Sequence, residues 1–424
     1  MKNNRIMVVA LALMMATATW AQTTKKEMLN DIYRTGSNYF AYPGPRQQKL
    51  SPPPAGYEPF YIFHYARHGS RYMSNNQYYL TAINMLDSAQ NVGLLSPKGK
   101  EVLEKLRIGY ADAWHRDGDL TELGGRQHRE IAHRMYERFN DLLSQPLQVE
   151  AKSSTSRRCM LSMFNFCMEM QSLNPAMEIT LDASKHDMKY VVEDLSLKPG
   201  ASPESDAMWQ QAKVIFERAH NPQRLVASLI TDTSKLTSSF NGRELMEALY
   251  NVAEDLQNVP ELGISLIDIF TPDELFDMWQ GYNVSWLLDT GLVPGSAPYY
   301  HILNEVVDSI MASADKVLME GKPAMTLRFS HDSSVLPLAY VLGLKEAMGA
   351  TNDLENLYKY ISIDKIIPMA ANIQMVFYRK NQSNDILVKF LLNENETTIP
   401  GINTKTPPYY HWNDVRSYIK SRRQ

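Results

Sequence analysis

A predominantly apolar run, Phe60-Tyr61-Ile62-Phe63-His64-Tyr65-Ala66, is followed at once by Arg67-His68-Gly69-Ser70-Arg71. A short run of this kind, bounded by polar chain, is typical of a buried strand. In open α/β sheets, ligands bind in the crevice beyond the carboxyl ends of the strands. The run therefore predicts an α/β sheet whose ligand crevice contains two arginines and a histidine.

The residue types at this strand end favour an oxyanion as the ligand. Arg67 and Arg71 carry planar, permanently charged guanidinium groups that suit a dianion such as phosphate. His68 has an ordinary pKa of about 6.5, so a neutral, nucleophilic imidazole is available near physiological pH. We therefore expect chemistry on a phosphoryl group, with His68 attacking phosphorus to form a phosphohistidine.

Two further predicted strands lead to residues that suit the same ligand. Residues 147–152 alternate apolar and polar side chains and lead to Arg158 at the start of a predicted helix. Residues 324–330 lead to His331 and Asp332. If the three strands run parallel as near neighbours, about 4.8 Å apart, their carboxyl ends converge on one crevice.

The charges suggest a role for each of these side chains. We expect Arg67, Arg71 and Arg158 to bind the equatorial oxygens of the phosphoryl group, and His331 to add a further hydrogen bond. Asp332 is the candidate general acid for the leaving alkoxide, and then the base that activates water. To act as an acid, Asp332 needs a raised pKa or an acidic medium.

Other residues of the same types have simpler interpretations. Arg157 is expected to lie on a solvated face, and His64, inside the first strand, to be a hydrogen-bonded core histidine. His115, His128 and His133 lack the spacing of metal ligands. We therefore predict no metal site and no other cofactor.

The only two cysteines, Cys159 and Cys167, lie eight residues apart in one predicted helix. That spacing separates them by about 12 Å along the helix axis, which is too far for a disulfide. We expect both to be free, buried thiols.

Residues 1–21 have the order of a secretory signal peptide: Lys2 and Arg5, an apolar stretch over 6–16, and small residues ending at Ala21. We predict cleavage after Ala21 and a secreted or periplasmic mature protein without an integral membrane segment. Loss of the two cations changes the formal net charge from −4 to −6. This balance gives no indication of nucleic-acid binding, and the oligomeric state stays open.

Strand-like and helix-like segments divide the rest of the chain. Residues 373–378 and 386–392 are predicted strands, whereas residues 174–300 contain helix-like segments and no convincing strand. We predict an α/β catalytic domain formed by residues 22–173 and 301–424, with a central mixed, mostly parallel sheet flanked by helices. Residues 174–300 would form an inserted all-α domain.

The motifs together resemble the histidine phosphatase superfamily, in particular its acid phosphatase and phytase branch and, within it, the multiple inositol polyphosphate phosphatases. The main marks are Arg67-His68-Gly69-Ser70-Arg71 and the distant pair His331-Asp332. Secondary marks are Leu120-Thr121-Glu122-Leu123-Gly124, the segment from Ser154 to Ser162, Pro368-Met369-Ala370-Ala371-Asn372 and Leu391-Leu392-Asn393-Glu394. The chain departs from the pattern at Met73, where many members have proline, and at His331-Asp332, where the subgroup often has His-Ala-Glu.

The resemblance implies a phosphoglycerate mutase-like α/β domain with an inserted α-domain, a phosphohistidine intermediate, no metal, and a small phosphomonoester as substrate, inositol polyphosphates first among them. The alternative within the branch is a broad-specificity acid phosphatase acting on sugar phosphates or nucleotides. A mutase is less compatible with the predicted export. A phosphate-ester binding protein without turnover would need neither the nucleophile His68 nor the acid Asp332.

Overall fold

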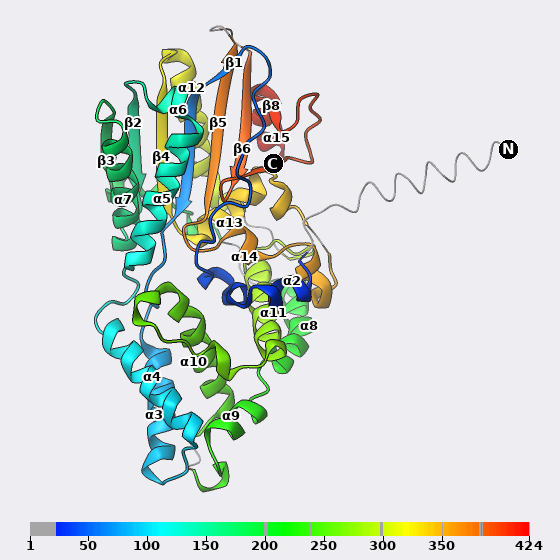
Figure 1. Ribbon diagram of the computed structural model, residues 1–424. Coiled ribbons are helices and arrows are strands. Elements are labelled where there is room, and N and C mark those ends of the chain that lie inside the picture. The colour runs from blue at the N-terminus through cyan, green and yellow to red at the C-terminus, as the bar shows by residue number, and fades with distance from the viewer. Residues whose placement is uncertain are drawn as a thin grey trace, which may run out of the picture.

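An eight-stranded sheet occupies one end of the molecule, and a group of helices occupies the other (Figure 1). The computed structural model describes residues 23–198, 202–236, 240–296, 300–349, 351–380, 383 and 385–423. The predicted signal peptide, residues 1–21, lies outside the described residues.

The sheet has the strand order β3-β2-β4-β1-β5-β6-β7, and β8 pairs with β6 beside this path. The neighbours from β3 to β1 are parallel, and the pairs formed by β5, β6, β7 and β8 are antiparallel. The sheet is therefore mixed, as predicted. The strands are β1 (Tyr57–Arg67), β2 (Gln148–Ser153), β3 (Glu178–Asp182), β4 (Ala324–Ser330), β5 (Asn372–Lys380), β6 (Ile386–Leu392), β7 (Asn395–Thr397) and β8 (Tyr409–His411).

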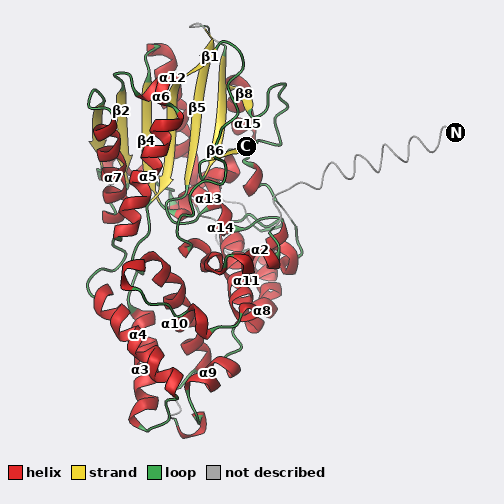
Figure 2. Ribbon diagram, in the orientation of Figure 1, coloured by secondary structure: helices red, strands yellow, loops and turns green. Residues whose placement is uncertain are grey.

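Strand β1 lies between two layers of helices (Figure 2), which explains why its sequence is apolar on both faces. Tyr61, Phe63 and Tyr65 belong to the core beneath α12 and α13. Ile62 and Ala66 belong to the opposite core, with α5 and α7. The flanking helices are α5 (Glu122–Arg138), α6 (Asn140–Leu143), α7 (Arg157–Leu173), α12 (Asn304–Glu320), α13 (Asp332–Val341), α14 (Ile363–Ile366) and α15 (Trp412–Arg422).

Helices α4 (Pro97–Ala113) and α5 both begin at a side-chain cap. The Ser96 hydroxyl accepts a hydrogen bond from the Gly99 amide, with Pro97 in the first helical turn. The Thr121 hydroxyl accepts one from the Gly124 amide, so α5 begins at Glu122.

The helical end of the molecule draws on two parts of the chain. Helices α3 (Gln77–Asn91) and α4 (Pro97–Ala113) share one apolar core with α9 (Gln223–Leu229) and α10 (Gly242–Asp255). The other helices in this region are α2 (Lys25–Asn30), α8 (Pro203–Ala219) and α11 (Pro272–Asp289). The predicted domain limits at 173/174 and 300/301 stay a prediction.

The 3-10 helices are short apart from η1 (Ile32–Tyr39). The remainder are η2 (Lys185–Tyr190), η3 (Leu195–Leu197), η4 (Thr233–Lys235), η5 (Leu256–Asn258), η6 (Pro260–Leu262), η7 (Ile267–Ile269), η8 (Tyr300–Leu303), η9 (Lys345–Ala347) and η10 (Leu354–Lys359).

The prediction that residues 174–300 contain no strand is wrong at β3. This segment pairs in parallel with β2 at the edge of the sheet. Only Ile179 and Leu181 are apolar in it, and none of its five residues is buried. An edge strand with so little burial lacks the apolar pattern by which strands are found in a sequence.

Within the described ranges, no helix combines the length and the hydrophobicity that crossing a bilayer requires.

Candidate active site

The three predicted strand ends meet at one edge of the sheet. In the registers of β1, β2 and β4, Arg67 pairs with Ser330, and Ser153 pairs with Phe329. The ladders continue one step further, because the His68 amide donates to the Ser330 carbonyl and the Ser154 amide donates to the Phe329 carbonyl, each at 3.0 Å. The chain segments that follow the three strands therefore leave the sheet side by side.

His68 is buried at this edge as a neutral imidazole. Its Nδ1 lies 2.9 Å from the Gly69 carbonyl oxygen. Because a carbonyl oxygen only accepts, Nδ1 carries the proton and Nε2 keeps its lone pair. Burial lowers the pKa of His68 well below its usual value, and the charges of Arg67, Arg158 and Arg71 lower it further.

Arg67 is fully buried, and its guanidinium is held from two sides. Nη1 donates to the carbonyls of Asn38, at 2.5 Å, and Ile367, at 2.7 Å. Nη2 forms an ion pair with Asp332 Oδ2 at 2.8 Å. Burial lowers the pKa of Arg67 to about 10, although the negative charge of Asp332 opposes this effect. The group therefore stays charged at neutral pH.

Arg71 lies over the ring of Tyr39, with 4.8 Å between the guanidinium carbon and the ring centre. Its Nη1 donates to the Tyr72 carbonyl. Burial would lower the pKa of Arg71, but the nearby Tyr39 and Asp255 hold it above its usual value.

Arg158 stands in the first turn of α7, beside His331. Its Nη2 lies 3.5 Å from His331 Nδ1, while His331 Nε2 lies 3.1 Å from the Ser154 hydroxyl. Burial and the charge of Arg158 lower the pKa of His331 to about 4, and the rings of His331 and His68 are 5.6 Å apart between centres. By contrast, the Arg157 side chain is 69% exposed and pairs with Asp119, so its predicted position on a solvated face is confirmed.

Asp332 begins α13 and faces the same group of cations. Oδ2 accepts a hydrogen bond from the Asn38 side-chain amide at 2.8 Å and pairs with Arg67. Oδ1 accepts from the Ser333 backbone amide at 3.0 Å. Burial alone would raise the pKa of Asp332, but Arg67, the Asn38 hydrogen bond and Arg71 hold it at about 2. In the free protein Asp332 is therefore a carboxylate at neutral pH.

All six predicted site residues thus lie at one edge of the sheet, together with residues that the motifs did not indicate. Asn38 and Tyr39 come from η1, in the polar chain that precedes β1, where no pattern marks them. Ser154 has no predicted role, although it directly follows β2 and begins one of the segments that carry the family resemblance.

Two of the histidines outside the site, His64 and His128, are fully buried. His64 is buried as predicted, but the expectation of a hydrogen-bonded core histidine is wrong, because neither ring nitrogen has a partner among the described residues. Its ring stacks on Phe166 at 4.9 Å between centres. Burial lowers the pKa of His64 and of the equally buried His128 to about 3. Both are neutral aromatic components of the core.

Cys159 and Cys167 are free and buried, as predicted. Across the described residues, no group of three or more histidine, cysteine, aspartate or glutamate side chains is placed to hold a metal ion.

The loop after β1 is held against the start of α5 by two glycines. A Cβ atom at Gly124 would lie 2.2 Å from the Ser70 carbonyl oxygen, and one at Gly69 would lie 2.4 Å from the Gly124 carbonyl oxygen. The Thr121 amide and hydroxyl both donate to the Ser70 carbonyl, at 2.9 and 3.1 Å. Gln127 binds the amide and hydroxyl of Ser70. The start of α5 therefore fixes the loop that carries His68.

We expect Gly124→Ala to displace this loop, because the added methyl group meets backbone rather than a movable side chain. Overpacking of this kind costs about 1–3 kcal/mol, so the variant should unfold at a lower temperature and lose at least about tenfold in kcat/KM, since misplacement by about 1 Å is costly in catalysis. Gly125→Ala is the matched control, since its Cβ would meet the Asn165 side chain at 3.1 Å. Equal losses in the two variants would contradict this account.

Adjoining parallel strands of the α/β sheet bring a neutral histidine together with three arginines, an arrangement that suits the binding of a phosphoryl group. Residues 65–393 match the histidine phosphatase superfamily (branch 2), and the chain belongs to this family.

The solved structures similar to this one include three of multiple inositol polyphosphate phosphatase from Bifidobacterium longum. The complex with inositol hexasulfate superposes with a TM-score of 0.74 at 18% identity, covering 91% of this chain and 97% of that chain. The phytase from D. castellii superposes with a TM-score of 0.65 at 15% identity, covering 92% of this chain and 85% of that chain. Hafnia alvei phytase superposes with a TM-score of 0.54 at 12% identity, covering 88% of this chain and 98% of that chain. No curated protein sequence matches this chain. At these identities the likeness establishes the fold.

Proposed function

We propose that this phosphatase is a secreted or periplasmic phosphomonoesterase that hydrolyses inositol polyphosphates through a phosphohistidine intermediate on His68. The observation that carries the proposal is the neutral imidazole of His68 placed among Arg67, Arg71 and Arg158. A nucleophile with a lone pair and three cations around it suits attack on a dianionic phosphate ester. The signal-peptide pattern of residues 1–21 supports export.

In the first step, His68 Nε2 forms a bond to phosphorus while the bond from phosphorus to the ester oxygen breaks. Arg67, Arg71 and Arg158 bind the phosphoryl oxygens, where negative charge collects in the transition state. Asp332 gives its proton to the leaving alkoxide. In the second step, Asp332 takes a proton from water as the water attacks phosphorus, and inorganic phosphate and the free imidazole are restored.

Substrate binding lets Asp332 hold the proton that the acid role requires. In the free protein the charge of Arg67 keeps the pKa of Asp332 at about 2. A bound phosphate dianion competes for the charge of Arg67 and adds its own negative charge beside the carboxylate, and both effects raise the pKa of Asp332. Asp332 is therefore ionised in the free protein and becomes protonated when the substrate is bound.

Inositol polyphosphates are the proposed substrate class because of the structural neighbours, one of which is a multiple inositol polyphosphate phosphatase bound to inositol hexasulfate. The test is phosphate release from myo-inositol hexakisphosphate, glucose 1-phosphate and a nucleoside monophosphate. A kcat/KM at least tenfold higher for the inositol ester is expected. Equal values would favour the broad-specificity alternative, and binding without release would favour the non-catalytic one.

Arg158→Ala is expected to lower kcat/KM on the order of 10²–10³-fold, the usual effect of losing one transition-state donor. Arg157→Ala is the matched control, since that neighbouring arginine is exposed and pairs with Asp119. It should change kcat/KM less than about threefold. Steady-state kinetics of both variants checks the prediction, and similar losses would remove Arg158 from its assigned role.

A further inference from the structure

The chain before β1 forms part of the site. Residues 32–51, here called the N-terminal segment, comprise η1 and the extended stretch that follows it. Figure 1 shows η1, coloured blue, between the strand ends and the helices α10 and α11. Nothing in the motifs of the sequence marks it as functional.

Asn38 contacts two of the proposed catalytic groups at once. Its backbone carbonyl accepts the hydrogen bond from Arg67 Nη1 at 2.5 Å. Its side-chain amide donates to Asp332 Oδ2 at 2.8 Å. The residue is 8% exposed, so few water molecules can replace these bonds.

We propose that Asn38 is a positioning residue for the general acid: it fixes the orientation of the Asp332 carboxyl and confines the transferable proton to Oδ1. This inference rests on the proposed function, since it assigns the acting oxygen of the same Asp332.

The donors around the carboxyl leave one place for the proton. The Asn38 amide and the Arg67 guanidinium can only donate at these positions, and both face Oδ2. A proton on Oδ2 would be directed at the Asn38 amide or the Arg67 guanidinium, neither of which can accept a hydrogen bond there. Oδ1 accepts one hydrogen bond, from the Ser333 amide, and has a second lone pair that can carry the proton.

The first half of the N-terminal segment is held firmly enough to position a side chain. The Arg34 guanidinium binds Asp364 Oδ2 through Nε and Nη2, at 2.8 and 2.6 Å. Thr35 donates to Glu254 and accepts from the Tyr250 hydroxyl. Ser37 has φ 60° and ψ −119°, which is a strained conformation that persists only where the surroundings enforce it.

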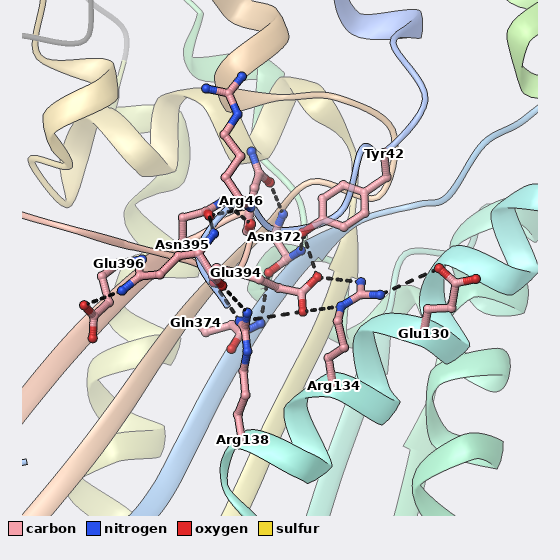
Figure 3. Close-up of polar contacts among 12 residues, drawn as sticks. Tyr42, Arg46, Glu130, Arg134, Arg138, Asn372, Gln374, Glu394, Asn395 and Glu396 are labelled. Carbon is pink, nitrogen blue, oxygen red and sulfur yellow. Dashed lines mark hydrogen bonds and ion pairs between the residues drawn. The ribbon is translucent and has the colours of Figure 1, made fainter. Parts of the chain in front are cut away.

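The second half is anchored by a buried carboxylate, as Figure 3 shows. Glu394 accepts hydrogen bonds from the Tyr42 hydroxyl at 2.8 Å and from Arg134 Nε and Nη2 at 2.9 and 2.7 Å. Arg138 donates to the Glu394 carbonyl. Asn395 accepts from the backbone amides of Arg46 and Gln47 in the same segment. Asn38 therefore lies between two fixed ends.

The pH dependence of turnover provides the test. The groups that act on Asp332 are Arg67, Arg71 and His331 together with Asn38, while Arg158 and His68 also face the site. Only the Asn38 contribution changes when that side chain is removed. Because its hydrogen bond favours the carboxylate, its loss should raise the pKa of the acid in the complex.

For Asn38→Ala we expect kcat to fall at least tenfold with inositol hexakisphosphate and less than threefold with para-nitrophenyl phosphate, whose leaving group needs little protonation. The alkaline limb of kcat should move to higher pH by about 0.5–1 unit. Asn38→Asp, which keeps the shape but places a second carboxyl beside the first, should move it further in the same direction. If Asn38→Ala does not fold, Asn38→Asp carries the test.

Thr35→Val is the matched control, because it loosens the same segment at Glu254 and leaves the bond between Asn38 and Asp332 in place. Thr35→Val should keep the wild-type ratio of kcat for the two substrates, and the alkaline limb of kcat should stay at the wild-type pH. Wild-type values in both Asn38 variants, or the same shift in Thr35→Val, would overturn the inference. If Asp332→Asn itself shows no leaving-group dependence, the proposed function fails instead.

Discussion

Replacing His68 by alanine is expected to abolish turnover, with kcat lower by on the order of 10⁵-fold, as for other enzymes that lose their nucleophile. The substitution would remove the proposed covalent route, because Nε2 is the lone pair that neutral His68 offers to phosphorus. Phosphate affinity should persist, since the three arginines remain. Phosphate release by the purified variant, with phosphate inhibition constants from competition, measures both quantities.

A trapping experiment separates this role from a structural one. Wild-type protein quenched during turnover of inositol hexakisphosphate should carry an alkali-stable phosphoryl group on His68, and His68→Ala should carry none. His133→Ala is the matched control, since that histidine is half exposed and pairs with Glu169 on the surface. A phosphorylated His68→Ala protein, or turnover within tenfold of wild type, would refute the assignment of the nucleophile.

Asp332→Asn is expected to have the second-largest effect, and one that depends on the leaving group. General acid catalysis contributes on the order of 10²–10⁴-fold, so inositol hexakisphosphate hydrolysis should slow by that factor. Cleavage of para-nitrophenyl phosphate should slow far less, because nitrophenolate departs without a proton. Rates with both substrates, compared with wild type, give the result.

The pH dependence of Asp332 also has a definite sign. Its pKa is held at about 2 in the folded protein, below the ordinary value of about 3.9. The stabilisation from its ion pair with Arg67 is therefore present above about pH 4 and disappears as the pH falls towards 2.

The leaving-group prediction for Asp332→Asn has a clear contradicting outcome. Equal slowing of inositol hexakisphosphate and para-nitrophenyl phosphate hydrolysis would remove this residue from the acid role.

The grouping of the six candidate site residues at one edge of the sheet could be predicted, because each lies at the end of a strand or within five residues of it. His68 comes one residue after β1, and His331 one residue after β4. In parallel strands the position along the chain then determines the edge at which a side chain emerges. The central strands β1 and β4 were predicted for a related reason, since burial on both faces demands apolar residues throughout.

Other parts of the site could not be predicted, because they depend on contacts between distant residues. Asn38 donates a hydrogen bond to Asp332, which lies 294 residues later in the chain, from a 3-10 helix in the polar stretch that precedes β1. The low pKa of Asp332 follows from that bond and from Arg67, not from any neighbour in the sequence. The unpaired state of His64 likewise depends on which rings pack around it, Phe166 among them.

The N-terminal segment imposes an order on the appearance of activity during synthesis. Its residues leave the ribosome long before their partners Asp332, Asp364 and Glu394. Asp332, Asp364 and Glu394 must therefore be synthesised before Arg67 and Asp332 can adopt the arrangement of the folded protein. A nascent chain that ends before residue 332 contains His68 but lacks Asp332, so we expect it to have no activity if both residues act as proposed.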